Sequence, residues 1–286
     1  MEPPARRGSP YNQPMSAILD EIVAAARKRV SEARKQADAR ELERRAREHQ
    51  VRGFRRGLEP AAATGTAVIA ELKKASPSRG VIRKDFDPGK LAAELARAGA
   101  SALSVLTDEE FFQGSLENLR RASAATNIPC LRKDFIVDEF QLLEARAHGA
   151  DAVLLIVAAL LPQELAALRR KSREFELDVL CEVHDQEELK RAVDAGCDII
   201  GVNSRDLRTF HVDLDTPQKL AQSIPRHVFR VAESGIHSGE DVRRLKAAGY
   251  QAFLIGESLM KAASPGASLK ELLAASAERS VSRASD

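Results

Sequence analysis

The fold of this chain is decided by the stretch Ile69-Ala70-Glu71-Leu72-Lys73-Lys74-Ala75-Ser76-Pro77-Ser78. An apolar run over residues 67–72 leads into the turn-forming residues Ser-Pro-Ser, a pattern typical of a buried strand that runs out into a loop. Glu71 and Lys73 are two positions apart, so on a strand both side chains point to the same face. A salt bridge at a strand end is the simpler interpretation of this pair. The later strands favour a functional interpretation.

The composition is that of a soluble globular protein. The chain has 286 residues, of which 44% are hydrophobic and 30% are charged, and these values are normal for globular domains. A net charge of +2 and an aromatic content of 4% provide neither a strong positive field nor stacking surfaces for bases. No apolar run reaches the roughly 20 residues that span a bilayer. We therefore expect neither nucleic acid nor a membrane as a partner.

The two ends of the chain and its cysteines bear on location. Residues 1–15 contain prolines but no apolar core, so we predict a flexible tail and no secretory signal. Residues 276–286 are predicted to form a C-terminal tail. Cys130, Cys181 and Cys197 are widely spaced and lie in or beside apolar runs, which fits neither a disulfide framework nor a metal site. Buried free thiols in a reducing compartment are expected, and they predict a cytoplasmic location.

Residues 16–65 are predicted to form a helical extension. From Ser16 onward, apolar residues recur about every four positions, which is the pattern of an amphipathic helix. The stretch 40–56 is densely charged and indicates a second, more exposed helix or a lid-like connector. Residues 57–65 begin and end with glycine and are expected to break the pattern before the first strand.

From residue 66 onward, short β-rich runs alternate with helical stretches. The runs are 67–72, 102–106, 129–131, 152–157, 179–183, 199–202, 228–232 and 252–255. Several intervening helices end in a glycine of the kind that caps helices in the left-handed conformation, and these are Gly99, Gly149, Gly196 and Gly249. Strands that alternate with helices of this length predict parallel βαβ units.

We predict an α/β fold, a closed (β/α)₈ TIM barrel over residues 66–275. An open doubly wound sheet is the alternative. The short strands and their even number favour closure. No Gly-x-Gly-x-x-Gly follows the first strand, which weakens the dinucleotide-binding form of the alternative.

Charged and polar residues follow the expected strands, whose C-terminal ends share one mouth in such a barrel. Glu71 and Lys73 end the first strand, Lys133 the third, Glu182 the fifth and Asn203 the sixth. One polar residue after a strand is ordinary. Several charges packed together cost desolvation free energy, so stability does not explain them easily. Their convergence predicts an active site.

Two further features indicate the kind of ligand. Ser234-Gly235 after the seventh strand and Gly256 after the eighth offer backbone N–H groups near helix starts, where barrels commonly bind phosphate. Plain turn glycines explain them equally well. Phe112 and Phe135 lie next to charged residues, where they either sandwich a planar ring or anchor loops.

His184 is a tempting general base because it follows Glu182 by two positions. No other histidine or cysteine lies at metal-ligand spacing, so no metal is expected. Asp185 has the position of an N-cap for the next helix, which explains the surroundings of His184. We therefore assign His184 no chemistry.

The chain resembles the indole-3-glycerol phosphate synthase family over residues 15–273. The resemblance rests on six motifs in the family's order, which are Ile69 to Ser78 as quoted above, Ser104-Val105-Leu106-Thr107 followed by Phe111-Phe112-Gln113-Gly114-Ser115, Leu131-Arg132-Lys133-Asp134-Phe135-Ile136, Glu182-Val183-His184-Asp185, Asn203-Ser204-Arg205-Asp206-Leu207 and Glu233-Ser234-Gly235-Ile236. Leu72 departs from the Val or Tyr usual in the family. The resemblance implies that the extension at 16–65 covers the barrel mouth.

The resemblance implies a carboxy-lyase of tryptophan biosynthesis. Its reaction closes a ring in 1-(2-carboxyphenylamino)-1-deoxyribulose 5-phosphate, with loss of carbon dioxide and water, to give indole-3-glycerol phosphate. Lysine and glutamate can supply the proton transfers without a metal or cofactor. By carry-over, Lys133 is the acid for ring closure, and Glu182 stabilises charge or handles protons. Lys73 either holds the substrate carboxylate or is the acid for dehydration.

The other implied site residues come from the same motifs and from the eighth strand end. The catalytic set is Glu71, Lys73, Lys133, Glu182, Asn203 and Ser234, in which Glu71 orients Lys73 and Asn203 binds a hydroxyl. Substrate contacts are expected at Ser76, Ser78, Phe112, Phe135, Arg205, Leu207, Glu233, Gly235, Gly256 and Glu257. A small phosphorylated substrate is expected as the partner, with no cofactor and no obligate protein partner.

Two other functions are possible for a barrel of this kind. A sugar-phosphate isomerase on the same barrel, such as phosphoribosylanthranilate isomerase, is expected to carry a Cys/Asp acid–base pair where this chain has Lys73 and Lys133. A catalytically silent barrel that senses a phosphorylated metabolite would have lost one of the lysines or glutamates, and none is lost.

Overall fold

The structure is a computed structural model that describes residues 16–205, 212–213 and 215–277. The tail predicted at 1–15 lies outside the described residues, and so does most of the tail predicted at 276–286. The expected substrate contact Leu207 also lies outside them. Residues 276 and 277 belong to the last helix, α13 (Pro265–Ala277).

In the described part of the chain, eight parallel strands form a closed barrel in the order β1-β10-β9-β8-β7-β6-β5-β4. The strands are β1 (Ala67–Leu72), β4 (Ala102–Leu106), β5 (Cys130–Lys133), β6 (Ala152–Ile156), β7 (Asp178–Val183), β8 (Ile199–Asn203), β9 (Phe229–Glu233) and β10 (Ala252–Ile255). Almost all their residues are buried, because one face fills the barrel and the other packs under the helices. The first strand pairs with the last, with Ala67 opposite Ala252. The predicted closed barrel is confirmed, and the open sheet is excluded.

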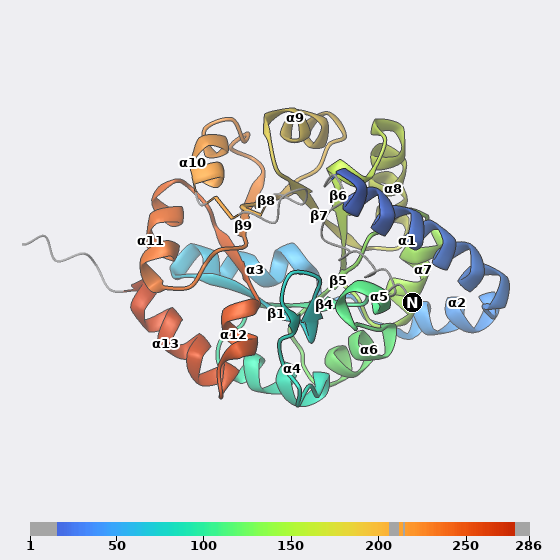
Figure 1. Cartoon of the computed structure of the whole chain (residues 1–286), viewed down its shortest axis with the longest axis horizontal. Coiled ribbons are helices and arrows are strands. Elements are labelled where there is room, and N and C mark those ends of the chain that lie inside the picture. Colours follow the sequence, from blue (N-terminus) through green and yellow to red (C-terminus); the bar gives the residue numbers. More distant parts are fainter. Residues whose placement is uncertain (1–15, 206–211, 214, 278–286) are drawn as a thin grey trace, which may run out of the picture.

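Helices surround the barrel (Figure 1). They are α4 (Pro88–Arg97), α5 (Glu109–Phe112), α6 (Leu116–Ala124), α7 (Phe140–Ala147), α8 (Pro162–Glu174), α9 (Gln186–Asp194), α10 (Asp215–Ala221), α11 (Gly239–Ala247) and α12 (Glu257–Lys261), with the short 3₁₀ helix η2 (Val157–Ala159) after β6. The expected capping glycines Gly99, Gly149, Gly196 and Gly249 have φ angles of 104°, 86°, 74° and 99°. These values confirm the left-handed caps, which glycine adopts without steric cost.

In the described segment from residue 16 onward, three helices precede β1, namely α1 (Ser16–Gln36), α2 (Ala39–Glu48) and α3 (Phe54–Thr64). The expected break over 57–65 is wrong, because α3 continues through most of that range. Gly57 lies inside α3, where an added Cβ atom would lie 2.7 Å from the ring of Pro129. This glycine therefore allows close packing against the start of β5 and does not end the helix.

The N-terminal helices contact opposite ends of the barrel. Arg29 of α1 bonds to Asp108 and Asp134, which follow β4 and β5. In contrast, α3 packs against β1 and β4 with Phe54 and Leu58 fully buried. Figure 1 shows α1 at one side of the barrel, in front of α7 and α8, and α3 behind the barrel. Thus α1 borders the mouth, and α3 covers the other end.

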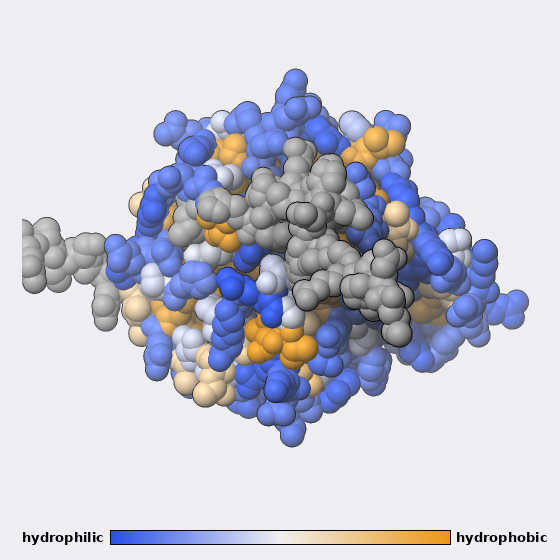
Figure 2. All heavy atoms as spheres, in the orientation of Figure 1, coloured by the Kyte–Doolittle hydropathy of each residue, from blue (hydrophilic) through white to orange (hydrophobic). Residues whose placement is uncertain are grey.

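The face that carries the mouth is largely hydrophilic, with small separate apolar patches (Figure 2). Val81 and Leu161 are the large hydrophobic side chains exposed among the residues that the structure describes. Across the same residues, no helix combines the length and the apolar character needed to cross a membrane.

Candidate active site

A cavity of about 460 Å³ opens at the C-terminal ends of the barrel strands. It is lined by every residue of the expected site that the structure describes, which are Glu71, Lys73, Ser76, Ser78, Phe112, Lys133, Phe135, Glu182, Asn203, Arg205, Glu233, Ser234, Gly235, Gly256 and Glu257. These residues lie far apart in the sequence. Closure of the barrel brings them together.

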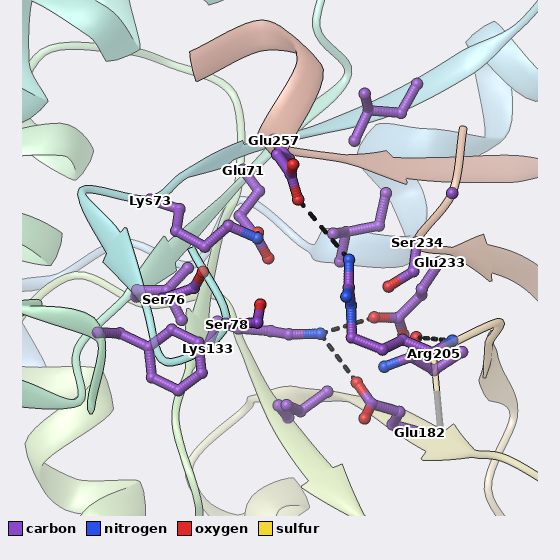
Figure 3. Close-up of a pocket in the computed structure, with 18 of the residues that line it drawn as sticks. Glu71, Lys73, Ser76, Ser78, Lys133, Glu182, Arg205, Glu233, Ser234 and Glu257 are labelled. Carbon is purple, nitrogen blue, oxygen red and sulfur yellow. Dashed lines mark hydrogen bonds and ion pairs between the residues drawn. The ribbon is translucent and has the colours of Figure 1, made fainter. Parts of the chain in front are cut away.

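Lys133, the last residue of β5, lies between two carboxylates (Figure 3). Its Nζ atom is 2.9 Å from Glu182 Oε2 and 2.6 Å from Glu233 Oε2. Burial by itself lowers the pKa of a lysine, but Glu182, Glu233 and Glu71 together raise the pKa of Lys133 well above its usual value. Lys133 therefore stays protonated at neutral pH.

Glu233, at the end of β9, is the carboxylate that can change its charge near neutral pH. Burial raises the pKa of Glu233 to about 7. Lys133 lowers this pKa, and the nearby carboxylate of Glu182 raises it further. Its Oε1 atom has no hydrogen-bond partner among the described residues. Gly201 makes room for this oxygen, because a Cβ atom there would lie 2.1 Å from Oε1. Glu233 is one of the substrate contacts expected from the sequence, and the structure adds its ion pair with Lys133.

Glu182, on β7, stays ionised. Burial raises the pKa of this carboxyl group, but Lys133 and His184 lower it well below its ordinary value. Its Oε1 atom is 3.4 Å from Nε2 of His184. His184 is not among the site residues expected from the sequence, although its spacing of two from Glu182 puts both side chains on one face of an extended strand. Asp185 caps α9 as predicted, by accepting a bond from the backbone N–H of Glu188.

A second ion pair lies on the end of β1. Lys73 Nζ is 2.6 Å from Glu71 Oε1, as their shared strand face predicts. Glu71 is buried and packs against Gly256, where an added Cβ atom would lie 2.5 Å from Glu71 Oε1. The absence of a side chain at Gly256 therefore leaves space for Glu71.

The loop expected after β1 is a small hairpin. Its strands are β2 (Ala75–Ser76) and β3 (Gly80–Val81), which pair antiparallel. The Ser-Pro-Ser turn forms the connection, and it brings Ser76 and Ser78 to the cavity wall. Figure 1 shows this hairpin in front of the barrel, close to α5.

The turn after β9 has a strained backbone. Ser234 and Gly235 have φ angles of 66° and 73°, and the left-handed conformation is uncommon for a residue other than glycine. Strain of this kind concentrates at functional sites. Both residues line the cavity together with Gly256, at the place where the sequence predicts phosphate.

Positive charge gathers around Glu257, which begins α12. Its carboxylate lies 3.4 Å from Arg79, 3.6 Å from Arg205 and 2.6 Å from Lys261. Arg79 and Arg205 also line the cavity. An anionic ligand at this end would therefore meet more cations than carboxylates.

Phe112 and Phe135 form one aromatic wall of the cavity. Their ring centroids are 6.5 Å apart and the ring planes are tilted by 35°, which is the geometry of a direct aromatic pair. The rings contact each other, so the suggested sandwich with a planar ligand ring between them does not match this geometry. A ligand ring can pack on the exposed side of the pair.

The sequence did not reveal how α1 is fixed beside the site. Arg29 donates to Asp108 over 2.9 Å and to Asp134 over 3.0 Å. Both carboxylates are buried and line the cavity. No local pattern identifies this link, because Arg29 is separated from its partners by 79 and 105 residues.

Residues 19–272 match the family model described as indole-3-glycerol phosphate synthase. The chain belongs to the indole-3-glycerol phosphate synthase family. An indole-3-glycerol phosphate synthase of Koribacter versatilis is 58% identical over 259 residues, an alignment that covers 91% of this chain and 100% of the relative. A second, from Bordetella pertussis, is 49% identical over 262 residues with the same coverage. The family predicted from six sequence motifs is confirmed.

Among solved structures, the barrel of this synthase family member is similar to that of mandelate oxidase. The TM-score is 0.55 at 20% sequence identity, and the match covers 74% of this chain and 71% of the other. At this identity the likeness shows the shared fold alone.

Proposed function

We propose that this chain converts 1-(2-carboxyphenylamino)-1-deoxyribulose 5-phosphate to indole-3-glycerol phosphate, with loss of carbon dioxide and water. The supporting observation is the cation of Lys133, held between Glu182 and Glu233 at the wall of a cavity. Membership of the family supplies the reaction. The cavity contains groups of the kinds that the reaction requires.

Lys133 is the acid for ring closure in this proposal. The aromatic carbon that bears the carboxylate attacks the carbonyl carbon of the sugar chain, and the carbonyl oxygen takes a proton from Nζ to become a hydroxyl. The carboxylate then leaves as carbon dioxide, and its bonding electrons restore the aromatic ring. Because its pKa is raised, Lys133 enters the reaction in the protonated form that can donate.

Dehydration needs an acid and a base. The hydroxyl leaves as water after protonation, and the carbon next to the nitrogen loses a proton. Glu182, which remains ionised, is the base in this proposal. Glu233, with its pKa raised to about 7, is suited to exchange protons with Lys133 between the two steps.

Lys73 has two possible roles that an experiment separates. It lies 2.6 Å from Glu71, which would orient it either to bind the substrate carboxylate or to protonate the departing hydroxyl. If Lys73 is the acid, a Lys73→Met variant accumulates the hydroxylated, decarboxylated intermediate. If it binds the carboxylate, the same variant raises KM and accumulates no intermediate. Rapid-quench analysis of a single turnover distinguishes the two results.

Substrate binding uses three parts of the cavity in this proposal. Ser234, Gly235 and Gly256 hold the phosphate, at backbone turns suited to an anion. Asn203 binds a hydroxyl of the sugar chain. The anilino ring packs on the aromatic wall of Phe112 and Phe135, and Ser76, Ser78, Arg205, Leu207, Glu233 and Glu257 complete the expected contacts.

The proposal includes a cytoplasmic location and no obligate protein partner. Cys130, Cys181 and Cys197 are buried free thiols, and thiols of this kind persist in a reducing compartment. The substrate is a small phosphorylated molecule, as the name of the family indicates.

The direct test is to mix the purified chain with the anilino-ribulose phosphate and follow the absorbance of the indole product, without added metal. We expect indole-3-glycerol phosphate from the wild type and at least about a hundredfold less from folded Lys133→Met. A folded wild type that forms no indole-3-glycerol phosphate would overturn the proposal. Isomerisation of phosphoribosylanthranilate in its place would support the isomerase alternative.

A further inference from the structure

His184 lies behind the active site, between two carboxylates. It follows β7, and its ring contacts Glu182 on one side and Glu188 on the other. Nε2 is 3.4 Å from Glu182 Oε1, and Nδ1 is 3.0 Å from Glu188 Oε2. His184 does not line the cavity, whereas Glu182 does. Any effect of His184 on the reaction must therefore act through Glu182.

Glu188 holds the imidazole ring in one orientation. Its Oε2 atom accepts a hydrogen bond from the backbone N–H of His184 over 2.8 Å as well as the contact from Nδ1. The backbone N–H of Glu188 in turn donates to Asp185 over 2.8 Å in the first turn of α9. These bonds fix Nδ1 on Glu188, so Nε2 faces Glu182.

The two oxygens of Glu182 face different cations. Oε2 accepts from Lys133 over 2.9 Å, and Oε1 lies beside His184. The 3.4 Å contact is close enough for an ion pair, but the buried Nε2–H is not aligned as a hydrogen bond. Lys133 thus forms ion pairs with both Glu182 and Glu233, and Glu182 has His184 as a second cationic neighbour.

The charge of His184 follows from its neighbours. Glu182 on β7 and Glu188 on α9 face its ring, and Lys133 on β5 and Glu233 on β9 lie beyond Glu182. Burial lowers the pKa of His184, but the two contacting carboxylates raise it to about 10. The ring is therefore an imidazolium across the neutral range.

A fixed imidazolium matters most when Lys133 gives up its proton. At that moment the cation on Oε2 becomes a neutral amine, and the buried carboxylate of Glu182 would be left without a counter-ion, which is unfavourable. His184 remains charged on Oε1. Glu182 can then stay ionised and in place for the following proton removal.

We propose that His184, held by Glu188, is a positioning residue that keeps the carboxylate of Glu182 ionised and directed towards Lys133 through the reaction. The proposal rests on the proposed roles of Lys133 and Glu182. It refines the interpretation of the sequence, in which Asp185 alone explained this segment.

The test compares two substitutions of the ring. His184→Leu keeps an apolar side chain in the buried position and removes both contacts, so kcat should fall by about tenfold or more while KM changes less than about threefold. The acid limb of the pH–kcat profile should move up by about one pH unit or more, because Glu182 has lost a nearby cation. His184→Gln keeps an N–H donor without the charge, so it should recover most of kcat but retain the shifted limb.

A matched control is His148→Gln. His148 is a partly buried histidine that follows α7, bonds through Nδ1 to the carbonyl oxygen of Glu144 and does not line the cavity. Its substitution should leave kcat and the acid limb at wild-type values. Melting temperature is measured for every variant.

The outcomes separate this inference from the proposed function. A wild type that forms no indole-3-glycerol phosphate refutes the function. Suppose that the wild type is active and His184→Leu folds. The inference alone is then refuted if this variant keeps both its kcat and its acid limb. It is also refuted if the variant loses melting temperature while its acid limb does not move. If His184→Leu does not fold, the pH–kcat profile of Glu188→Gln is measured in its place. An acid limb at the wild-type pH in Glu188→Gln also refutes the inference.

Discussion

Replacing Lys133 with methionine removes the positive charge from the centre of the site and keeps a long, unbranched side chain. In the wild type, Nζ lies 2.9 Å from Glu182 and 2.6 Å from Glu233. In the variant, the two buried carboxylates face each other across an apolar side chain. The consequences for rate and for stability can be predicted separately.

The rate should fall by at least about a hundredfold. A positioned general acid contributes about 10² to 10⁴ in rate, and the loss of electrostatic stabilisation of the developing charge adds to this effect. The fold should remain, because the barrel interior still receives a side chain of similar size. Glu182→Gln should reduce kcat to a similar extent, because it removes the base of the same proposal.

The stability of Lys133→Met should depend on pH in a defined direction. Removing one partner of a buried ion pair costs about 3–5 kcal/mol in free energy of unfolding. The folded pKa of Glu233 is already raised to about 7 from 4.5, so folding favours its protonated form and loses stability as the pH rises through that value. Lys133 lowers this pKa, and its loss raises the pKa further. The deficit relative to the wild type should therefore be smaller at about pH 5.5 than at about pH 8.

Three measurements check this prediction. Formation of indole-3-glycerol phosphate gives kcat, circular dichroism verifies the fold, and urea unfolding at both pH values gives the free energy of unfolding. The double variant Lys133→Met/Glu233→Gln should recover stability at the higher pH without recovering activity. Near-normal kcat in folded Lys133→Met would refute the assigned acid. An equal stability deficit at both pH values would refute the charge argument.

Three further substitutions test other parts of the molecule. Gly235→Asp places a carboxylate at the predicted phosphate site and should raise KM by about tenfold or more. It should also lower the melting temperature somewhat, because a residue other than glycine must adopt the φ of 73° found at this position; a normal KM would show that phosphate binds elsewhere. Arg29→Met leaves Asp108 and Asp134 without this cation and should lower the free energy of unfolding by about 2 kcal/mol. Arg27→Met removes an exposed ion pair and is the control, which should change the free energy of unfolding very little. Leu58→Ala opens a cavity beneath the barrel and should cost about 2–5 kcal/mol in urea unfolding while kcat per folded molecule stays normal; a fall in kcat would show that α3 influences the distant site.

The sequence predicted the strands well because each is buried along its length and therefore is an apolar run. The range of β5 shows where that reasoning fails. It was expected at 129–131, but it extends to Lys133, through two charged residues. Lys133 pairs with Glu182, which is 49 residues away, whereas Arg132 pairs with Asp134, two positions along the chain, and with Glu144. A prediction from the local sequence pattern ends the strand at such charges, because the pattern does not show which groups neutralise them.

The N-terminal helices were predicted less well. The glycines at 57 and 65 predict a break, yet Gly57 lies inside α3 and allows the close approach to Pro129. The amphipathic α1 was recognised from its spacing, but its link through Arg29 depends on side chains from two later strands. Propensity describes a segment alone, and here tertiary packing overrides it.

At the site, the order of polar strand ends predicted which residues meet, but not which of them pair. Lys133, Glu182 and Glu233 were all expected at one mouth, and the ion pairs among them follow from the heights at which their strands are aligned in the barrel. The spacing of His184 from Glu182 was visible in the sequence. The helix cap at Asp185 explains the same segment, so the sequence alone does not assign this spacing to the site.

The pairing of β1 with β10 has a consequence for the way the chain is made. The first barrel strand leaves the ribosome long before its last neighbour exists, so one of its two edges has no partner until synthesis of the barrel is nearly complete. An unpaired strand edge is a template for association with other chains. Chains that stop before residue 252 should therefore aggregate more readily than the full-length protein, and assistance by chaperones should matter most during that interval.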